Sequence, residues 1–281
     1  VIDLKVEIHP NEIYYVLVHG GALVAKDRSF TDYVAHRFYN QLFEVVMNHL
    51  NRNSSAITTR SQQVRQVDSV WLSDISVKHV LTEDQPGTRV NFDVLVEADY
   101  EVSERDRRHD RYSEEADWFK VSCTADLAQN LNDFRITGIE VYNYRGKQHN
   151  PLSDALVPII YKEQLEGVAR EFLSNYYPEA LDGSVAVNPY TLAERMGLTV
   201  DEKSLTPDAS IFGQIYFYDC EAEHYDDFTG EPLTVGVKAG TIFVDPANFF
   251  LRNLGSKYNT IVHECVHWHL HRKSFELERL Y

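Results

Sequence analysis

The chain has 281 residues with 43 acidic side chains against 27 Lys and Arg, giving a formal net charge of −16. This acidity argues against direct binding to nucleic acid, because phosphate contacts require clustered Lys and Arg. The apolar runs are too short to cross a bilayer, which argues against a membrane protein. The three cysteines are widely spaced and odd in number, which predicts a reducing, cytoplasmic compartment and no disulfide framework.

Residues 1–150 predict an α+β domain in which an antiparallel sheet curves over one long helix. Alternating residues favour short strands at 4–8 and 13–18, and apolar residues then recur at helical spacing from Phe30 to Leu50. Further strands are expected at residues 67–80, 90–100, 118–124 and 134–141, with Gly138 at a bulge.

The first half shows no catalytic constellation, and its function is not indicated by the sequence. The charged segment 101–115 is expected to be a solvated hairpin tip. The composition changes at residues 144–151, which predicts a linker and a domain boundary after residue 150. The histidines of this half are scattered and are interpreted as structural: His9, His19, His36, His49, His79 and His109.

Residues 151–281 predict a second α+β domain. An amphipathic helix is expected at 165–176, and a shorter one follows the capping pair Asn188-Pro189. Strands are expected at 211–218, 233–237 and 241–244, with residues 238–240 joining the last two as a hairpin. An acidic stretch at 220–232 favours a solvated loop, although three of its residues could contact a metal or a basic substrate: His224, Asp226 and Asp227.

The most informative motif is the H-E-x-x-H of His263, Glu264 and His267. Positions i and i+4 share one face of a helix, so the two imidazoles can bind one zinc ion while Glu264 takes a proton from water. Ser256 is the expected N-cap of this helix. A chance match in a chain with 12 histidines is the alternative, and the apolar residues around the motif argue against it.

The order of elements in the second half resembles the ImmA/IrrE family of zinc metallopeptidases. The matching segments are residues 166–173, 192–200 and 240–244, which lead into the H-E-x-x-H. The resemblance covers about residues 158–281 and no part of the first half. It implies a zincin-like peptidase in which His263 and His267 bind Zn²⁺ and Glu264 is the general base. Its substrate would be a protein, and family members cleave helix-turn-helix repressors.

The third zinc ligand of the family is a Glu within a later E-x-x-A-N-x-F-A segment, which these 281 residues do not contain. We therefore expect the third ligand beyond residue 281 and interpret the chain as a fragment. Glu276 or Glu278 would have to fold back to replace it. His271 is expected to point away from the metal, because successive i+4 positions drift by about 40° per step. His269 is expected on another face, and Cys265 and Trp268 in the core.

In zincin-like sites an extended substrate commonly pairs with an edge strand, for which the segment 233–244 is the candidate.

Other functions of the second half remain open. The main alternative is a regulatory protein whose peptidase half has lost activity and which acts through partner binding. A non-peptidase zinc hydrolase would instead require a closed pocket for a small molecule.

Overall fold

The structure is a computed structural model. It describes residues 2–9, 12–19, 29–54, 67–105, 110–143, 150–183, 185–246 and 254–281. Residues 144–149 of the expected linker and His109 lie outside these ranges, as do the side chains of His9 and His19. Within the described ranges, no helix combines the length and the apolar content that a membrane crossing requires.

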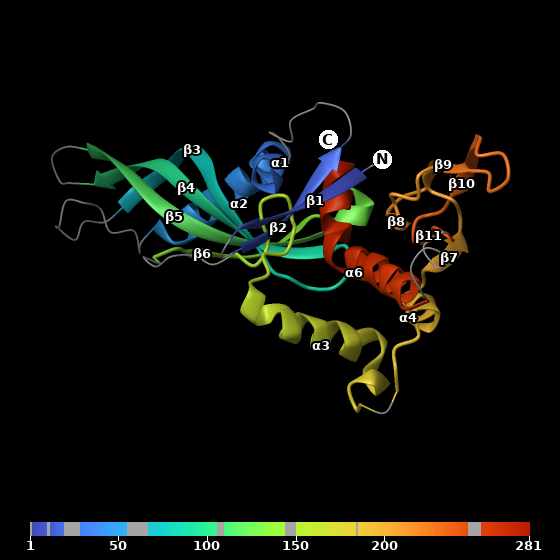
Figure 1. The fold of residues 1–281 in the computed structure, drawn as a ribbon. Helices are drawn as coiled ribbons and strands as arrows, with labels where there is room; N and C mark the ends of the chain where they lie inside the picture. Colours follow the sequence, from blue (N-terminus) through green and yellow to red (C-terminus); the bar gives the residue numbers. More distant parts are fainter. Residues whose placement is uncertain are drawn as a thin grey trace. The chain divides into compact units, whose positions relative to one another are not determined.

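The chain divides into two compact units (Figure 1). The first unit comprises Val1–Asp3, His19–Ile159 and Glu276–Tyr281, and the second comprises Leu4–Val18 and Ile160–Phe275. The division after Ile159 differs from the boundary expected after residue 150, and the last six residues belong with the first unit. Among the described strands, none from residues 67–141 joins a sheet of residues 199–244.

The helical part of the first unit is split in two. One helix was expected between Phe30 and Leu50, but α1 (Phe30–Arg37) and α2 (Tyr39–Arg52) are separated at Phe38, whose backbone leaves the helical region (φ −111°, ψ 13°). The Phe38 ring stacks on Phe134 with 3.8 Å between the centroids. Strands β1 (Ile2–His9) and β2 (Glu12–His19) form a two-stranded sheet at the segments predicted to be strands.

The large sheet is an antiparallel meander with the order β3-β4-β5-β6. Its strands are β3 (Val67–Thr82), β4 (Arg89–Arg105), β5 (Asp110–Asp126) and β6 (Arg135–Val141). The segment 101–115 is mostly strand rather than hairpin tip, because β4 and β5 extend into it. The bulge predicted at Gly138 is confirmed, since the register changes between the pairs Ser122–Gly138 and Cys123–Ile136.

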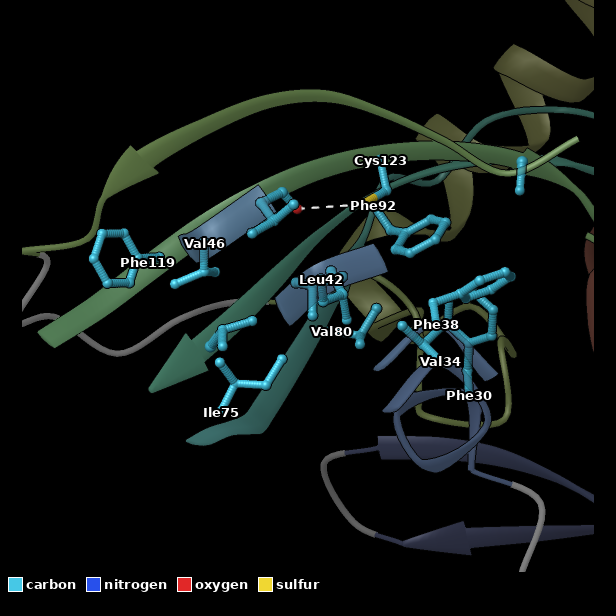
Figure 2. Packing of buried hydrophobic residues seen from close by; sticks show 14 of the residues in the cluster. Phe30, Val34, Phe38, Leu42, Val46, Ile75, Val80, Phe92, Phe119 and Cys123 are labelled. Atoms are coloured by element: carbon cyan, nitrogen blue, oxygen red, sulfur yellow. Dashed lines mark hydrogen bonds between the residues drawn. The ribbon is translucent and has the colours of Figure 1, made fainter. Parts of the chain in front are cut away.

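The core of the first unit lies between α1, α2 and one face of this sheet (Figure 2). Leu42 and Val46 of α2 and Val94 of β4 are fully buried there. Each such side chain contributes roughly 1.5–3 kcal/mol relative to an exposed one. The prediction of a helix packed on an antiparallel sheet is therefore confirmed, and the fold is of the mixed α+β class.

Besides most of the β1-β2 pair, the described residues of the second unit form three helices and two small sheets. The helices are α3 (Leu165–Tyr176), α4 (Pro189–Arg195) and most of α6 (Leu254–Glu278). Strands β7 (Thr199–Glu202), β11 (Thr241–Val244) and β8 (Gly213–Tyr216) form one sheet in the order β7-β11-β8. Strands β9 (Cys220–Tyr225) and β10 (Pro232–Val237) pair antiparallel as the other. Short 3₁₀ turns in the two units occupy Leu127–Gln129, Lys162–Gln164 and Pro178–Ala180.

Two secondary-structure expectations for residues 220–244 are wrong. Residues 238–240 do not close a hairpin, because β10 pairs with β9 while β11 lies between β7 and β8. The acidic stretch 220–232 is not all loop, since its first six residues form β9. The helix α4 follows the prediction: Asn188 Oδ1 accepts hydrogen bonds from the N–H groups of Tyr190 and Thr191.

Candidate metal centre

The helix α6 carries the complete H-E-x-x-H motif. It begins at Leu254, so Ser256 lies inside the helix and is not its N-cap. The Thr260 hydroxyl donates to the Ser256 carbonyl oxygen at 3.0 Å, as a side chain one turn later in a helix can. The predicted N-cap is therefore wrong, whereas the helical spacing of the three motif residues is present.

His263 and His267 point their Nε2 atoms at one another. The two nitrogens are 2.9 Å apart, and the rings are nearly perpendicular at 88°. Two ligands of a tetrahedral zinc ion with Zn–N bonds of about 2.05 Å have nitrogens about 3.3 Å apart. A separation of the rings by a few tenths of an ångström would therefore fit this pair to zinc. His267 is only 7% exposed, whereas His263 is exposed, so the pair is open to solvent on one side.

Glu264 lies below the surface and is 7% exposed. Burial raises the pKa of its carboxyl group to about 7, and a hydrogen bond from the Ile215 backbone acts in the opposite direction. A carboxyl group that titrates near neutrality can accept a proton and return it at physiological pH. The burial of Glu264 and its raised pKa are compatible with general acid–base chemistry.

The strand β8 approaches α6 very closely at Gly213. A Cβ atom on this residue would overlap the Thr260 Cγ2 atom and would lie 3.2 Å from Glu264 Oε1. Only glycine therefore allows this spacing between the strand backbone and the helix. The close approach places the Glu264 carboxylate directly against the backbone of β8.

Among the described strands, β8 also lies at an edge of its sheet. Asp245 N donates to the Phe212 carbonyl oxygen at 3.0 Å. In an antiparallel pair, residues hydrogen-bonded to the partner strand alternate with residues whose backbone groups face away, so this bond identifies Gly213 and Ile215 as facing away from β11. The N–H of Ile215 consequently faces away from β11, where it meets Glu264. The edge expected at 233–244 is not the one beside the motif, because β11 is central in its sheet and β10 belongs to the other.

The position of His271 in the sequence predicted a side chain that points away from the motif, and this prediction is wrong. The Nδ1 atom of His271 is 2.8 Å from Nδ1 of His267, and the residue is 3% exposed. A side chain can compensate for a drift of about 40° per step by its choice of rotamer. The sequence signal for this contact is the spacing, because His263, His267 and His271 follow one another at two successive i+4 steps.

The two buried histidines have strongly lowered pKa values. Burial, and to a smaller extent repulsion from His271 and His263, lowers the pKa of His267 to about 3. Burial, followed by repulsion from His263, lowers the pKa of His271 to about 4. Both imidazoles are therefore neutral at pH 7, which is the state that binds a metal ion.

The other residues predicted around the motif lie on different faces. His269 Nδ1 is 3.2 Å from the hydroxyl of Tyr176 on α3, consistent with the expected separate face. Cys265 is fully buried in the core, as expected, and burial raises the pKa of its thiol to about 12. Trp268 packs on the same core cluster and stacks with Phe217.

Glu276 and Glu278 do not fold back toward the histidine pair. The helix is continuous to Glu278, which places Glu276 roughly 13 Å beyond His267 along the axis. The Glu276 carboxylate instead accepts from Arg279 at 2.9 Å. Within the described ranges, no group of three or more His, Cys, Asp or Glu side chains is arranged to hold a metal ion.

The acidic stretch after β9 is a structured turn. Asp226 Oδ1 accepts from the backbone N–H groups of Phe228 and Thr229, and Asp227 is hydrogen-bonded to Ser204. His224 lies at the end of β9 rather than in a loop. These contacts give the two carboxylates a role in the turn itself.

Comparisons of the chain with protein-family models, with curated proteins and with solved structures found no match. The resemblance to the ImmA/IrrE family therefore rests on the sequence segments alone and stays a prediction. The geometry on α6 is a separate argument for a metal site, because it depends on the positions of His263, Glu264 and His267 and not on the resemblance.

Proposed function

We propose that this protein is a zinc-dependent endopeptidase with a zincin-like second unit. The observation that carries the proposal is the convergence of the His263 and His267 Nε2 atoms, 2.9 Å apart, beside the buried Glu264. Burial lowers the pKa of both His263 and His267, and two such imidazoles beside a carboxyl group with a pKa of about 7 are suited to hold zinc and to move a proton. By family resemblance we extend the proposal to a cytoplasmic protein substrate, a helix-turn-helix repressor.

Each residue of the proposed site has its own role in peptide hydrolysis. Zinc, when bound, supplies a Lewis acid that polarises the scissile carbonyl and acidifies water. His263 and His267 would hold the ion, and a third protein ligand is also required, since catalytic zinc usually has three. Glu264 accepts a proton from the attacking water, whose oxygen bonds to the carbonyl carbon. Glu264 then delivers the proton to the amine nitrogen as the C–N bond breaks.

The edge strand β8 is the proposed guide for the substrate. The N–H and C=O groups of Gly213 and the C=O group of Ile215 face away from β11, so an extended peptide could pair with them by strand addition, whereas the Ile215 N–H already donates to Glu264. Such a peptide would lie beside Glu264, because the Ile215 backbone already contacts that carboxylate. The position of β8 thus replaces the segment 233–244 as the proposed substrate edge.

A regulatory role without catalysis is the second candidate function. It is favoured by the ligand count, because the described residues offer two histidines and no third ligand arranged with them. In that case the protein would act by binding a partner, and the intact protein would neither retain zinc nor cleave a protein.

The test compares Glu264→Gln with His263→Ala in the intact protein. Glu264→Gln removes the base but no proposed ligand, so zinc should stay bound while cleavage falls on the order of a hundredfold or more. His263→Ala should lose both zinc and cleavage. The measurements are zinc stoichiometry by elemental analysis and cleavage of a candidate repressor.

Glu171→Gln is the matched control, because Glu171 is an exposed residue of α3, and it should behave as wild type. Wild-type cleavage by Glu264→Gln would show that Glu264 is not the base. Full zinc content in His263→Ala would show that this histidine is not a ligand.

A further inference from the structure

His263, His267 and His271 form a continuous series of ring contacts along one face of α6. The Nε2 atoms of the first two are 2.9 Å apart, and the Nδ1 atoms of the last two are 2.8 Å apart. The middle ring, His267, therefore uses both of its nitrogens. The contact with His271 is not part of the H-E-x-x-H motif.

The hydrogen atoms of this series restrict its chemistry. A neutral imidazole carries one N–H and one acceptor nitrogen. A distance of 2.8 Å between two Nδ1 atoms requires that one of them donates. If His271 donates, the proton of His267 lies on Nε2 and blocks metal binding. If His267 donates, its Nε2 atom carries no proton and accepts the Nε2–H of His263 across the 2.9 Å contact, so its lone pair can pass to zinc when His263 moves its proton to Nδ1.

We propose that His271 is a positioning residue: its Nδ1 atom accepts the Nδ1–H of His267 and so keeps Nε2 of His267 available for zinc. This inference rests on the proposed metal site. Metal-binding histidines almost always donate their second N–H to a neighbouring acceptor, which fixes the tautomer and the ring orientation. Here the acceptor is on the same helix one turn later, and at 3% exposure it is shielded from bulk water.

The proposal predicts different effects for two substitutions at this position. His271→Asn keeps an acceptor oxygen near the place of Nδ1, whereas His271→Leu keeps apolar volume without an acceptor. We expect His271→Leu to weaken zinc binding by roughly 10–100-fold and His271→Asn by a smaller factor. His269→Leu is the control, because His269 contacts Tyr176 on another face and should leave zinc affinity unchanged.

The experiment measures the zinc dissociation constant of the intact protein by competition with a chromophoric chelator, after circular dichroism has shown that each variant is folded. A second readout is the tautomer of His267 in the zinc-free protein, read from its imidazole ¹⁵N shifts. The proton should be on Nδ1 in wild type and His271→Asn, and should redistribute toward Nε2 in His271→Leu.

Each outcome separates this inference from the proposed function. A wild-type His267 protonated on Nε2, or equal zinc affinities of His271→Leu and wild type, would overturn the role of His271 only. An equal loss in His271→Asn and His271→Leu would show that His271 fills space rather than accepts a proton. An intact wild-type protein that binds no zinc would overturn the proposed function, and the tautomer of His267 would still show which ring donates.

Discussion

The buried side chains of α2 are all apolar, whereas α6 buries polar side chains as well as apolar ones. On α2 the buried residues are Leu42, Val46 and Leu50, all apolar and each one i+4 step from the next. On α6 the same spacing buries a histidine pair, His267 and His271. The first pattern lowers the free energy of the folded state by removing apolar surface from water. The second removes polar groups from water, which costs free energy unless they find partners.

Burial shifts the pKa values of three buried polar groups of α6 in opposite directions for one reason. It raises the pKa of Glu264 and lowers those of His267 and His271, because it disfavours the charged form of each group. The helix is held to its sheet by apolar neighbours such as Ile261, which is fully buried. We interpret the buried polar face as a site that is retained for its chemistry rather than for stability.

The largest expected effect in this comparison is on α2. Leu42→Ala removes a fully buried side chain from the core of the first unit and should lower the free energy of unfolding by about 2–5 kcal/mol. Glu44→Ala is the control on the exposed face of the same helix and should change it by about 0.5 kcal/mol or less. Urea denaturation followed by circular dichroism measures both, and equal effects would contradict the one-sided burial of α2.

A smaller effect is expected where α6 meets β8. Gly213→Ala places a methyl group against Thr260 Cγ2, so we expect a loss of about 1–3 kcal/mol in the free energy of unfolding. Thr260→Ser removes that methyl group and should restore part of the loss in the double variant. Gly236→Ala is the control, because no atom lies within 4 Å of its Cβ position. A loss in the double variant as large as in Gly213→Ala would show that the clash lies elsewhere.

Local patterns in the sequence were sufficient for much of this fold. The helix α3 has the bounds expected from its apolar spacing, Asn188 caps α4, and the bulge lies at Gly138. Each of these features depends on neighbours within a few residues. The pairing of His263 with His267 is of the same kind, because helix geometry alone sets it.

Features that depend on distant partners could not be predicted in the same way. The partner of β11 on one side is β7, which precedes it by about forty residues, so adjacency in sequence wrongly suggested β10. In β9 the acidic residues obscured an alternation that buries Ala222. The contact of His271 depends on a rotamer, which the spacing does not specify.

The smallest effect is expected from replacing the histidine pair itself. The double variant His267→Leu/His271→Leu removes both partners of the 2.8 Å hydrogen bond and puts apolar side chains of similar size in their place. Such a replacement is often neutral or stabilising, so the zinc-free free energy of unfolding should fall by less than about 1 kcal/mol or rise.

The single variant His271→Leu should cost more than the double variant, about 1–3 kcal/mol, because it leaves the N–H of His267 without this acceptor in a buried position. Urea denaturation with a chelator present measures both variants, and zinc binding should be lost in the double. If the double variant lost as much free energy of unfolding as Leu42→Ala, the contrast between α2 and α6 would be contradicted. The histidine pair would then support the fold as Leu42 does, and the buried polar face of α6 would no longer argue for a site.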